Sequence, residues 1–460
     1  MANSTNFCNV NNNGNSNNWN APNSNGVRPI SRACFASSSN GETKSTGNQE
    51  RKRPARVLKL EQTEPTLLLT SSTAICGFLI SMGYLFDEAT SIDALYQAFS
   101  LCKKGSDWKA SVQRFELNLL PNLRRLQNEL RSGAYKPQEY HEFVLNERGK
   151  ERHIKSQPVR DRVVQRSFCD NVLIPVLRRY LIYDNGASLN GKGVSFARNR
   201  LVCHLQRFFR GHGENGYVLK IDFSKFFDNI RHDVLFERIA EKLDDPQALA
   251  LLDVILQSNA IDVSDLSEPE RKELFDGVFN SLSFTPSDKG EAFMPKGLGI
   301  GSQVSQICGV FALTRVDTLC KIVHQCKYYG RYMDDIYVIH EDKDFLKSLL
   351  EEIRAEALKI GLHVNDRKTK ITPLRAGLVF MQVKYHFTVT GHLVKRPSAN
   401  KVVRERRKLK AYRGLLDRGL MTRKDIANAY QSWRGNMRQL DSYRSIKSTD
   451  KVYTKLFVDN

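Results

Sequence analysis

The segment that most constrains the fold is residues 328–340, which read YYGRYMDDIYVIH. Two runs of aromatic and β-branched residues, 328–332 and 336–339, flank a Met-Asp-Asp centre. This pattern predicts a β-hairpin with adjacent carboxylates at its tip, and its apolar strands indicate packing between other elements. A water-exposed Asp-Asp turn is the simpler interpretation. Carboxylates beside a buried surface instead require a cation or another partner.

A third carboxylate, Asp222, favours the second interpretation. It follows a strand-like run, residues 217–221, and can meet the hairpin tip across neighbouring strands of one sheet. Oxygen-only ligands suit Mg²⁺, which keeps water and substrate phosphates in its other positions. Two such ions about 3.5–4 Å apart can activate a 3′-hydroxyl and stabilise a pyrophosphate leaving group. Phosphoryl transfer depends mainly on positioning and charge neutralisation, so three carboxylates can suffice.

The Tyr-Met-Asp-Asp hairpin and Asp222, with an aromatic residue five positions later, resemble the palm of a reverse transcriptase. The resemblance covers roughly residues 82–460. It implies an α+β, right-hand polymerase fold with fingers, a palm of antiparallel sheet plus helices, and a helical thumb. The residues that it implies to be catalytic are Asp222, Asp334, Asp335 and Lys368. The implied ligands of two Mg²⁺ ions, with Mn²⁺ as a substitute, are Asp222, Phe223, Asp334 and Asp335.

The same resemblance assigns contacts to substrates. Residues implied to bind the incoming nucleotide are Arg148, Lys150, Arg152, Phe227, Ile300 and Gly301. Residues implied to contact template or primer are Arg160, Arg162, Ser195, Arg198, Gln306, Tyr332, Met333, Phe380, Met381, Arg406 and Arg407. Guanidinium groups match phosphate oxygens, although a solvated basic face is the alternative for each one singly. Phe227 would press on the sugar where a 2′-hydroxyl would sit, and plain core packing is its alternative.

Residues 296–306, KGLGIGSQVSQ, mark a branch within that family. Most group II intron-like enzymes place Gln-Gly here and end the motif with Ser-Pro, whereas this chain has Ile300-Gly301 and Ser305-Gln306. That pattern resembles the reverse transcriptases of diversity-generating retroelements. An Ile cannot make the amide hydrogen bond of a Gln, so selectivity that rests on this contact should fall. We therefore expect low fidelity, and the resemblance implies errors at template adenines.

Composition is consistent with a nucleic-acid partner. The 460-residue chain has 70 Lys and Arg against 50 Asp and Glu, a net charge of +20. Excess positive charge favours a polyanionic partner without fixing a fold. The nine cysteines form no Cys-x-x-Cys motif, which indicates reduced thiols and a cytoplasmic protein rather than structural zinc.

The first 81 residues differ from the rest. An Asn/Gly/Ser-rich tract lies within residues 3–25, a basic patch at 51–56 and an apolar run at 66–86. We expect residues 1–81 to be disordered or translated upstream template sequence, with Met82 as a natural start. Hydroxyl and glycine residues dilute the apolar run, so no membrane span is expected.

The remaining chain is expected to form three further regions: N-terminal helices and fingers at 82–216, a palm at 217–394 with an insertion near 261–293, and a basic helical thumb at 395–460. A hairpin is expected at 143–155. Apolar periodicity predicts helices at 92–99, 108–131, 201–209, 234–256, 307–323, 345–360, 403–417, 423–435 and 449–457.

The predicted function is RNA-directed DNA synthesis, which copies a template RNA into cDNA to diversify a protein-coding gene. A group II intron-type or phage-defence reverse transcriptase, or a non-catalytic RNA-binding derivative, remains an alternative. The implied partners are template RNA, the RNA–cDNA duplex, deoxynucleoside triphosphates and a small, basic, helical, oligomeric accessory protein.

Overall fold

The structure is a computed structural model that describes residues 84–147, 150–264, 267 and 293–458. These residues belong to one of the two units into which the chain divides, and the other unit, residues 17–79, lies outside them. The predictions for residues 1–81 and for most of the 261–293 insertion therefore fall outside the described residues.

A four-stranded antiparallel sheet carries the two predicted acidic segments. Its order is β6 (Tyr329–Tyr332), β7 (Asp335–His340), β3 (Tyr217–Ile221) and β8 (Lys370–Pro373). The predicted hairpin is confirmed, because Tyr332 pairs with Asp335 and leaves a two-residue turn between them. The strand before Asp222 pairs with β7, as expected. Every residue of β6 is buried, which explains why the hairpin sequence is apolar on both faces.

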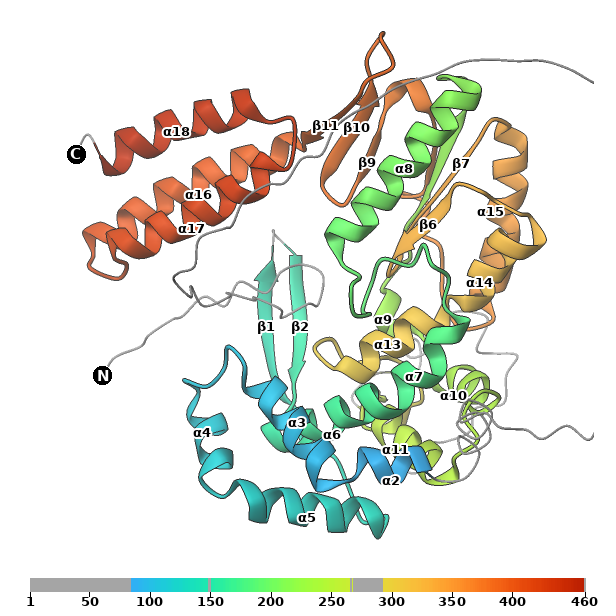
Figure 1. The fold of residues 1–460 in the computed structure, drawn as a ribbon, viewed down its shortest axis with the longest axis vertical. Helices are drawn as coiled ribbons and strands as arrows, with labels where there is room; N and C mark the ends of the chain where they lie inside the picture. Colours follow the sequence, from blue (N-terminus) through green and yellow to red (C-terminus); the bar gives the residue numbers. More distant parts are fainter. Residues whose placement is uncertain (1–83, 148–149, 265–266, 268–292, 459–460) are drawn as a thin grey trace, which may run out of the picture. The chain divides into compact units, whose positions relative to one another are not determined.

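Two long helices pack on this sheet. Helix α8 (Val194–His212) contacts β6 and β7, and α15 (Lys343–Leu358) contacts β7 and β8 (Figure 1). The Asp342 carboxylate caps α15 by accepting hydrogen bonds from the first turn. Leu346, Leu349 and Ile353 then recur at helical spacing and are buried.

The N-terminal helices are α2 (Tyr84–Ala89), α3 (Ile92–Lys103), α4 (Ala110–Leu117) and α5 (Leu119–Arg131). The prediction of one helix over 108–131 was wrong, because α4 and α5 are separated at Asn118, where ψ is +43°. Pro121 accounts for the break. It has no N–H for the carbonyl four residues earlier, but it is tolerated in the first turn of a new helix.

The predicted hairpin near 143–155 is formed by β1 (His141–Glu147) and β2 (Lys150–Ser156). Helix α6 (Val159–Phe168) follows, continues through a π-helical turn (Cys169–Leu173) and α7 (Ile174–Leu177), and ends in a 3₁₀ turn (Arg178–Tyr180). Helix α6 packs against α3, so the hairpin stands on a helical base (Figure 1).

Two more predicted helices are broken. The 234–256 prediction corresponds to α10 (His232–Ala240) and α11 (Pro246–Gln257), and Asp245 caps the second helix beside its Pro. The short α9 (Phe226–Asn229) precedes them, and β4 (Ile261–Asp262) pairs with β5 (Phe293–Met294) at the base of the predicted insertion.

The 307–323 prediction corresponds to three elements: α13 (Gln303–Ala312), α14 (Thr314–Thr318) and a π-helical turn (Leu319–Val323). The Ser302 hydroxyl caps α13 by accepting a hydrogen bond from the Ser305 N–H. A local break at Leu313 starts the second helix.

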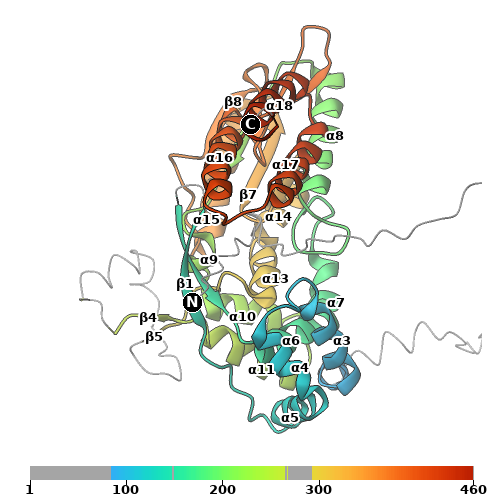
Figure 2. The same ribbon diagram turned by 90° about the vertical axis from the view of Figure 1, so that its left-hand side faces the viewer.

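A second sheet leads into the C-terminal helices. After a 3₁₀ turn (Leu374–Ala376), β9 (Leu378–Phe380), β10 (Val383–Phe387) and β11 (Leu393–Pro397) form an antiparallel sheet. Helices α16 (Ala399–Asp417), α17 (Arg423–Arg438) and α18 (Tyr443–Phe457) lie side by side (Figures 1 and 2). They have a separate core around Leu409, Tyr430 and Met437. All three predicted C-terminal helices are confirmed, with longer bounds than expected.

No helix in the described part of the chain is long and apolar enough to cross a membrane.

Candidate active site

The three predicted carboxylates converge at one end of the main sheet. Ile221 pairs with Ile336, so Asp222, which follows β3, lies beside the turn between β6 and β7. Asp334 is in that turn and Asp335 begins β7. Met333 has φ +54°, a left-handed conformation that a non-glycine residue adopts at a cost of about 1–3 kcal/mol. The hairpin therefore places its acidic tip with a strained backbone.

Burial and, to a smaller degree, mutual repulsion raise the pKa of the hairpin carboxylates. Burial raises the pKa of Asp334 to about 7, and the charges of Asp335 and Asp222 add to the effect. Burial also raises the pKa of Asp335, against the opposing charge of Lys220. The charge of Asp222 therefore disfavours ionisation of both hairpin carboxylates, and the charge of Asp335 adds to this effect on Asp334.

Two lysines lie against the carboxylates. The Lys368 ammonium donates a hydrogen bond to Asp222, and Lys220 Nζ lies 3.3 Å from Asp335 Oδ1. The segment that carries Lys368 also holds the Asp222 backbone, because the Asn365 N–H donates to the Asp222 carbonyl over 2.8 Å. The predicted residue Lys368 is thus brought to the site.

The carboxylate cluster is a candidate site for divalent cations. Within the described ranges, no group of three or more His, Cys, Asp and Glu side chains has the arrangement of a metal site. The donor set is nevertheless suitable, because half-buried, mutually repelling carboxylates are hard oxygen ligands. The Phe223 side chain has no ligand atom, so only its backbone carbonyl could serve as the predicted ligand.

Phe227 is half-buried in α9, five residues after Asp222. Its carbonyl accepts a hydrogen bond of 2.8 Å from the Leu298 N–H. Its ring meets Phe226 edge-on, with 5.2 Å between centroids. A Cβ added at Gly309 in α13 would lie only 3.1 Å from the Phe227 ring. Helix α13 therefore supports this aromatic side chain closely.

The predicted nucleotide residues Ile300 and Gly301 lie in the turn before α13. Ile300 is half-buried and Gly301 is exposed with φ +118°, a conformation that favours glycine. A Cβ at Gly301 would lie 3.5 Å from the Lys155 carbonyl in β2, so this turn adjoins the hairpin. Gln306 is half-buried and accepts a hydrogen bond from the Ser188 hydroxyl at 3.4 Å.

The basic residues of the hairpin and α6 differ in what the structure shows. Arg148 lies outside the described residues, and Lys150 and Arg152 lie in β2 with side chains that are not described. Arg160 binds Glu129 and donates to the Lys136 carbonyl at 3.0 Å. A template contact would have to displace these bonds. Arg162 is half-buried, with a buried Nε that has no partner in the described part of the chain.

The predicted template and primer residues near α8 are also partly occupied within the protein. Ser195 is exposed in the first turn of α8. Arg198 donates to the Met381 carbonyl over 2.6 Å. Met381 and Gln382 form the turn between β9 and β10, with φ of +47° and +62°. Phe380 is fully buried, so its side chain is not available to a primer.

Tyr332 and Met333 are buried at 6% and 7% exposure, so only a small part of each can meet a nucleic acid. On α16, Arg406 is half-buried and donates to the Ser448 hydroxyl at 2.6 Å, whereas Arg407 is exposed. Arg407 is therefore the freer of the two predicted thumb contacts.

Sequence reasoning missed Lys220 and Arg331. Strand alternation could have found Lys220. Residues two positions apart along a strand share a face, and Lys220 in β3 is two positions before Asp222. Arg331 is the one charged residue of β6, in a strand that is otherwise aromatic and glycine. A charge in so apolar a strand indicates a buried partner.

This arrangement of a palm sheet, converging carboxylates and flanking helices defines a right-hand polymerase. The family profile described as reverse transcriptase (RNA-dependent DNA polymerase) matches residues 146–394. The chain belongs to this family. The family generally uses divalent metal ions.

Solved structures of telomerase are similar to this chain at low identity. Apo telomerase from Candida tropicalis is 16% identical to this chain, with a TM-score of 0.36. The match covers 56% of this chain and 49% of the telomerase chain. Telomerase from Candida albicans in complex with a TWJ fragment of telomeric RNA is 12% identical, with a TM-score of 0.40. That match covers 70% of this chain and 61% of the telomerase chain. The chain thus spans about half to three fifths of these telomerase chains. No curated protein matches it.

Proposed function

We propose that this chain is the polymerase of a diversity-generating retroelement, which copies a template RNA into cDNA with errors at template adenines. The finer assignment is carried by one observation: Ile300-Gly301 and Ser305-Gln306 stand where group II intron-like enzymes have Gln-Gly and Ser-Pro. The adenine preference comes from the resemblance, and the residue change supplies a physical reason for low fidelity.

The proposed chemistry assigns a role to each residue at the end of the sheet. Asp222, Asp334 and Asp335 would hold two divalent cations, with Mg²⁺ preferred by hard oxygen ligands. When bound, these ions would activate the primer 3′-hydroxyl and stabilise the leaving pyrophosphate. Lys368 would supply a proton or a positive charge to the pyrophosphate. Phe227 would border the sugar and exclude a 2′-hydroxyl.

Low fidelity is supported by the place of Ile300. Ile300 is half-buried in the turn before α13, and the glycines on both sides of it face Lys155 of strand β2. An aliphatic group there cannot hydrogen-bond a base pair, whereas a Gln amide could. A site without such a polar contact rejects wrong pairs less strongly.

The proposed regions are those predicted from sequence: N-terminal helices and fingers at 82–216, palm at 217–394 and thumb at 395–460. The thumb would lie on the RNA–cDNA duplex through exposed basic residues such as Arg407, which position a duplex without reading its sequence. A small, basic accessory protein and a cytoplasmic location complete the proposal.

The proposal is tested by primer extension on a defined RNA template, followed by sequencing of the products. Wild-type protein should misincorporate more often opposite adenine than opposite the other bases, and Ile300→Gln should lower that excess. An unchanged error spectrum in Ile300→Gln would contradict the assigned role. An even spectrum in the wild type would favour a group II intron-type or phage-defence enzyme, and RNA binding without extension would favour a non-catalytic derivative.

A further inference from the structure

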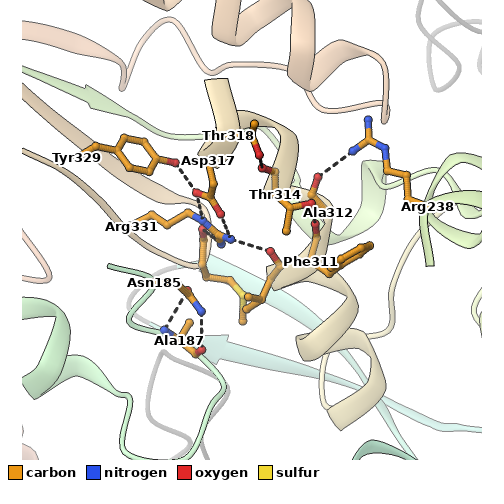
Figure 3. Close-up of polar contacts among 12 residues, drawn as sticks. Asn185, Ala187, Arg238, Phe311, Ala312, Thr314, Asp317, Thr318, Tyr329 and Arg331 are labelled. Carbon is orange, nitrogen blue, oxygen red and sulfur yellow. Dashed lines mark hydrogen bonds and ion pairs between the residues drawn. The ribbon is translucent and has the colours of Figure 1, made fainter. Parts of the chain in front are cut away.

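A buried ion pair lies directly behind the acidic hairpin. Arg331 in β6 and Asp317 in α14 have side chains that are 0% and 1% exposed. The guanidinium makes two parallel bonds to the carboxylate, Nε to Oδ1 at 2.8 Å and Nη2 to Oδ2 at 2.7 Å (Figure 3). Buried pairs contribute little net stability compared with apolar residues of similar size, so this one calls for another explanation.

The remaining donors of Arg331 reach two functional elements. Nη2 donates to the Val310 carbonyl in α13 at 2.8 Å, and Nη1 donates to the Met333 carbonyl at 3.4 Å. Met333 is the strained residue of the turn that carries Asp334. One guanidinium thus connects the acidic turn to α13.

The contact with α13 is next to the support of Phe227. Val310 directly follows Gly309, whose Cα faces the Phe227 ring closely enough that an added Cβ would lie 3.1 Å away. A shift of α13 at this turn would move the surface on which the ring rests. Close packing transmits such displacements because protein interiors have few voids.

We propose that Arg331 is a positioning residue that fixes the Asp334 turn and the Phe227 wall relative to one another. Loss of its guanidinium relaxes divalent-cation binding and sugar selection together, although Arg331 touches neither ligand. This inference rests on the proposed roles of Asp334 as a metal ligand and Phe227 as the sugar boundary.

The backbone around Arg331 is held independently of its side chain. The Arg331 N–H donates to the Asp184 carbonyl at 3.2 Å, and the Arg331 carbonyl accepts from the Gly186 N–H at 2.9 Å. The Asn185 side chain stiffens this segment by bonding both backbone groups of Ala187 (Figure 3). Strand β6 therefore keeps its place when the ion pair is replaced.

The test uses the full chain with both partners replaced, Arg331→Met and Asp317→Leu, so that no lone charge is buried. The matched control is Tyr329→Phe. The Tyr329 hydroxyl donates to Asp317 Oδ1 at 2.6 Å, the oxygen that also accepts from Arg331 Nε. Removing this hydroxyl leaves the bonds from Arg331 to the Val310 and Met333 carbonyls intact. Arg331→Lys is a second variant, which keeps the charge but cannot reach Asp317, Val310 and Met333 together.

Two readouts are measured: Mn²⁺ affinity by electron paramagnetic resonance without nucleotide, and the preference for dNTP over rNTP in single-turnover primer extension. The double variant and Arg331→Lys should each weaken Mn²⁺ binding and lower the sugar preference by about tenfold, as for other residues that orient ligands. Tyr329→Phe should change neither by more than about twofold.

Two reference variants separate the possible failures. If Asp334→Asn weakens Mn²⁺ binding and Phe227→Ala lowers the sugar preference, but folded Arg331 variants keep both properties, the positioning role is wrong. If Asp334→Asn or Phe227→Ala has no effect, the proposed site assignment itself has failed, and the Arg331 inference falls with it. A change in only one of the two properties would also overturn the coupling.

Discussion

The Lys368 ammonium is hydrogen-bonded to the Asp222 carboxylate. Lys368 is nearly half exposed, and Asp222 is 16% exposed. Together with the Lys220–Asp335 pair, this contact places two positive charges among three mutually repelling acids. The acidic end of the sheet is therefore partly neutralised by the chain's own lysines.

Lys368→Met should slow nucleotide incorporation by about 10²-fold, the lower range for loss of a general acid. Mn²⁺ affinity should stay equal or rise, because a competing cation next to Asp222 is removed. Single-turnover kinetics and Mn²⁺ titration measure the two effects. Lys370→Met is the control, since Lys370 is an exposed lysine in β8 that is paired in register with Lys220. Equal rates for Lys368→Met and Lys370→Met would exclude the catalytic role.

Phe227→Ala should admit ribonucleotides, lowering the preference for dNTP by about tenfold or more, because the ring no longer fills the space of a 2′-hydroxyl. Competing dNTP and rNTP in primer extension measures this ratio. The neighbouring Phe226 is 5% exposed and serves as the control. Phe226→Leu should cost about 1 kcal/mol of stability and leave the ratio unchanged. A wild-type ratio in Phe227→Ala would mean that this ring is only core.

Arg198→Met should weaken primer–template binding by about tenfold, because the turn at Met381 and Gln382 loses the hydrogen bond that holds its strained backbone. The sugar preference should not change. Fluorescence anisotropy with a labelled duplex measures the affinity. Arg207→Met is the matched control, since Arg207 is exposed on the same helix and the charge change is identical. Equal losses of affinity in both variants would mean that only the lost positive charge matters, and would contradict a role for the Arg198–Met381 hydrogen bond.

The buried, neutral His232 should lower the free energy of unfolding in mild acid, whereas the raised pKa of Asp334 acts in the opposite direction over the same pH range. His232 Nε2 lies 2.6 Å from the Gly297 carbonyl, and His232 Nδ1 has no partner in the described part of the chain. Burial lowers the pKa of His232 from 6.5 to about 4. Between pH 6.5 and about 4, His232 is protonated in the unfolded chain but not in the folded one. Its contribution should therefore lower the free energy of unfolding by at most about 1.4 kcal/mol for each unit by which the pH falls.

Urea unfolding at several pH values between 4 and 7.5 measures this slope. His232→Gln should flatten it, while His392→Gln, at an exposed position, should not. Burial also lowers the pKa of His204 to about 4, so part of the slope should remain in the first variant. If His232→Gln leaves the pH dependence of the free energy of unfolding unchanged, His232 is not buried in its neutral form.

The sequence predicted the elements whose pattern is local. The alternation in the hairpin and the strand before Asp222 is strong, and the sheet register then brings the acids together. Long helices were predicted correctly where one apolar face runs without interruption, as in α15. They were predicted wrongly where a Pro or a local backbone break interrupts that face, as at Asn118 and Leu313.

The side-chain partners could not be predicted to the same degree. Arg160 and Arg198 fit a nucleic-acid role by residue type, yet each donates a hydrogen bond to a backbone carbonyl of the protein, Arg160 to Lys136 and Arg198 to Met381. The partner of Arg331 lies 14 residues earlier, in another helix, and only the fold brings Asp317 to it. Such pairings depend on tertiary packing, which periodicity does not report.

The assignment of Asp222, Asp334 and Asp335 as the catalytic acids requires that they support RNA-templated DNA synthesis. Primer extension with a purified RNA template, dNTPs and Mg²⁺ should give full-length cDNA with the wild-type chain. Asp334→Ala should reduce the rate by at least about 10³-fold while RNA binding is retained. Asp366→Ala, at an exposed position, should behave as the wild type. Equal extension by Asp334→Ala and wild type, or no extension by a wild-type chain that binds RNA, would contradict the account.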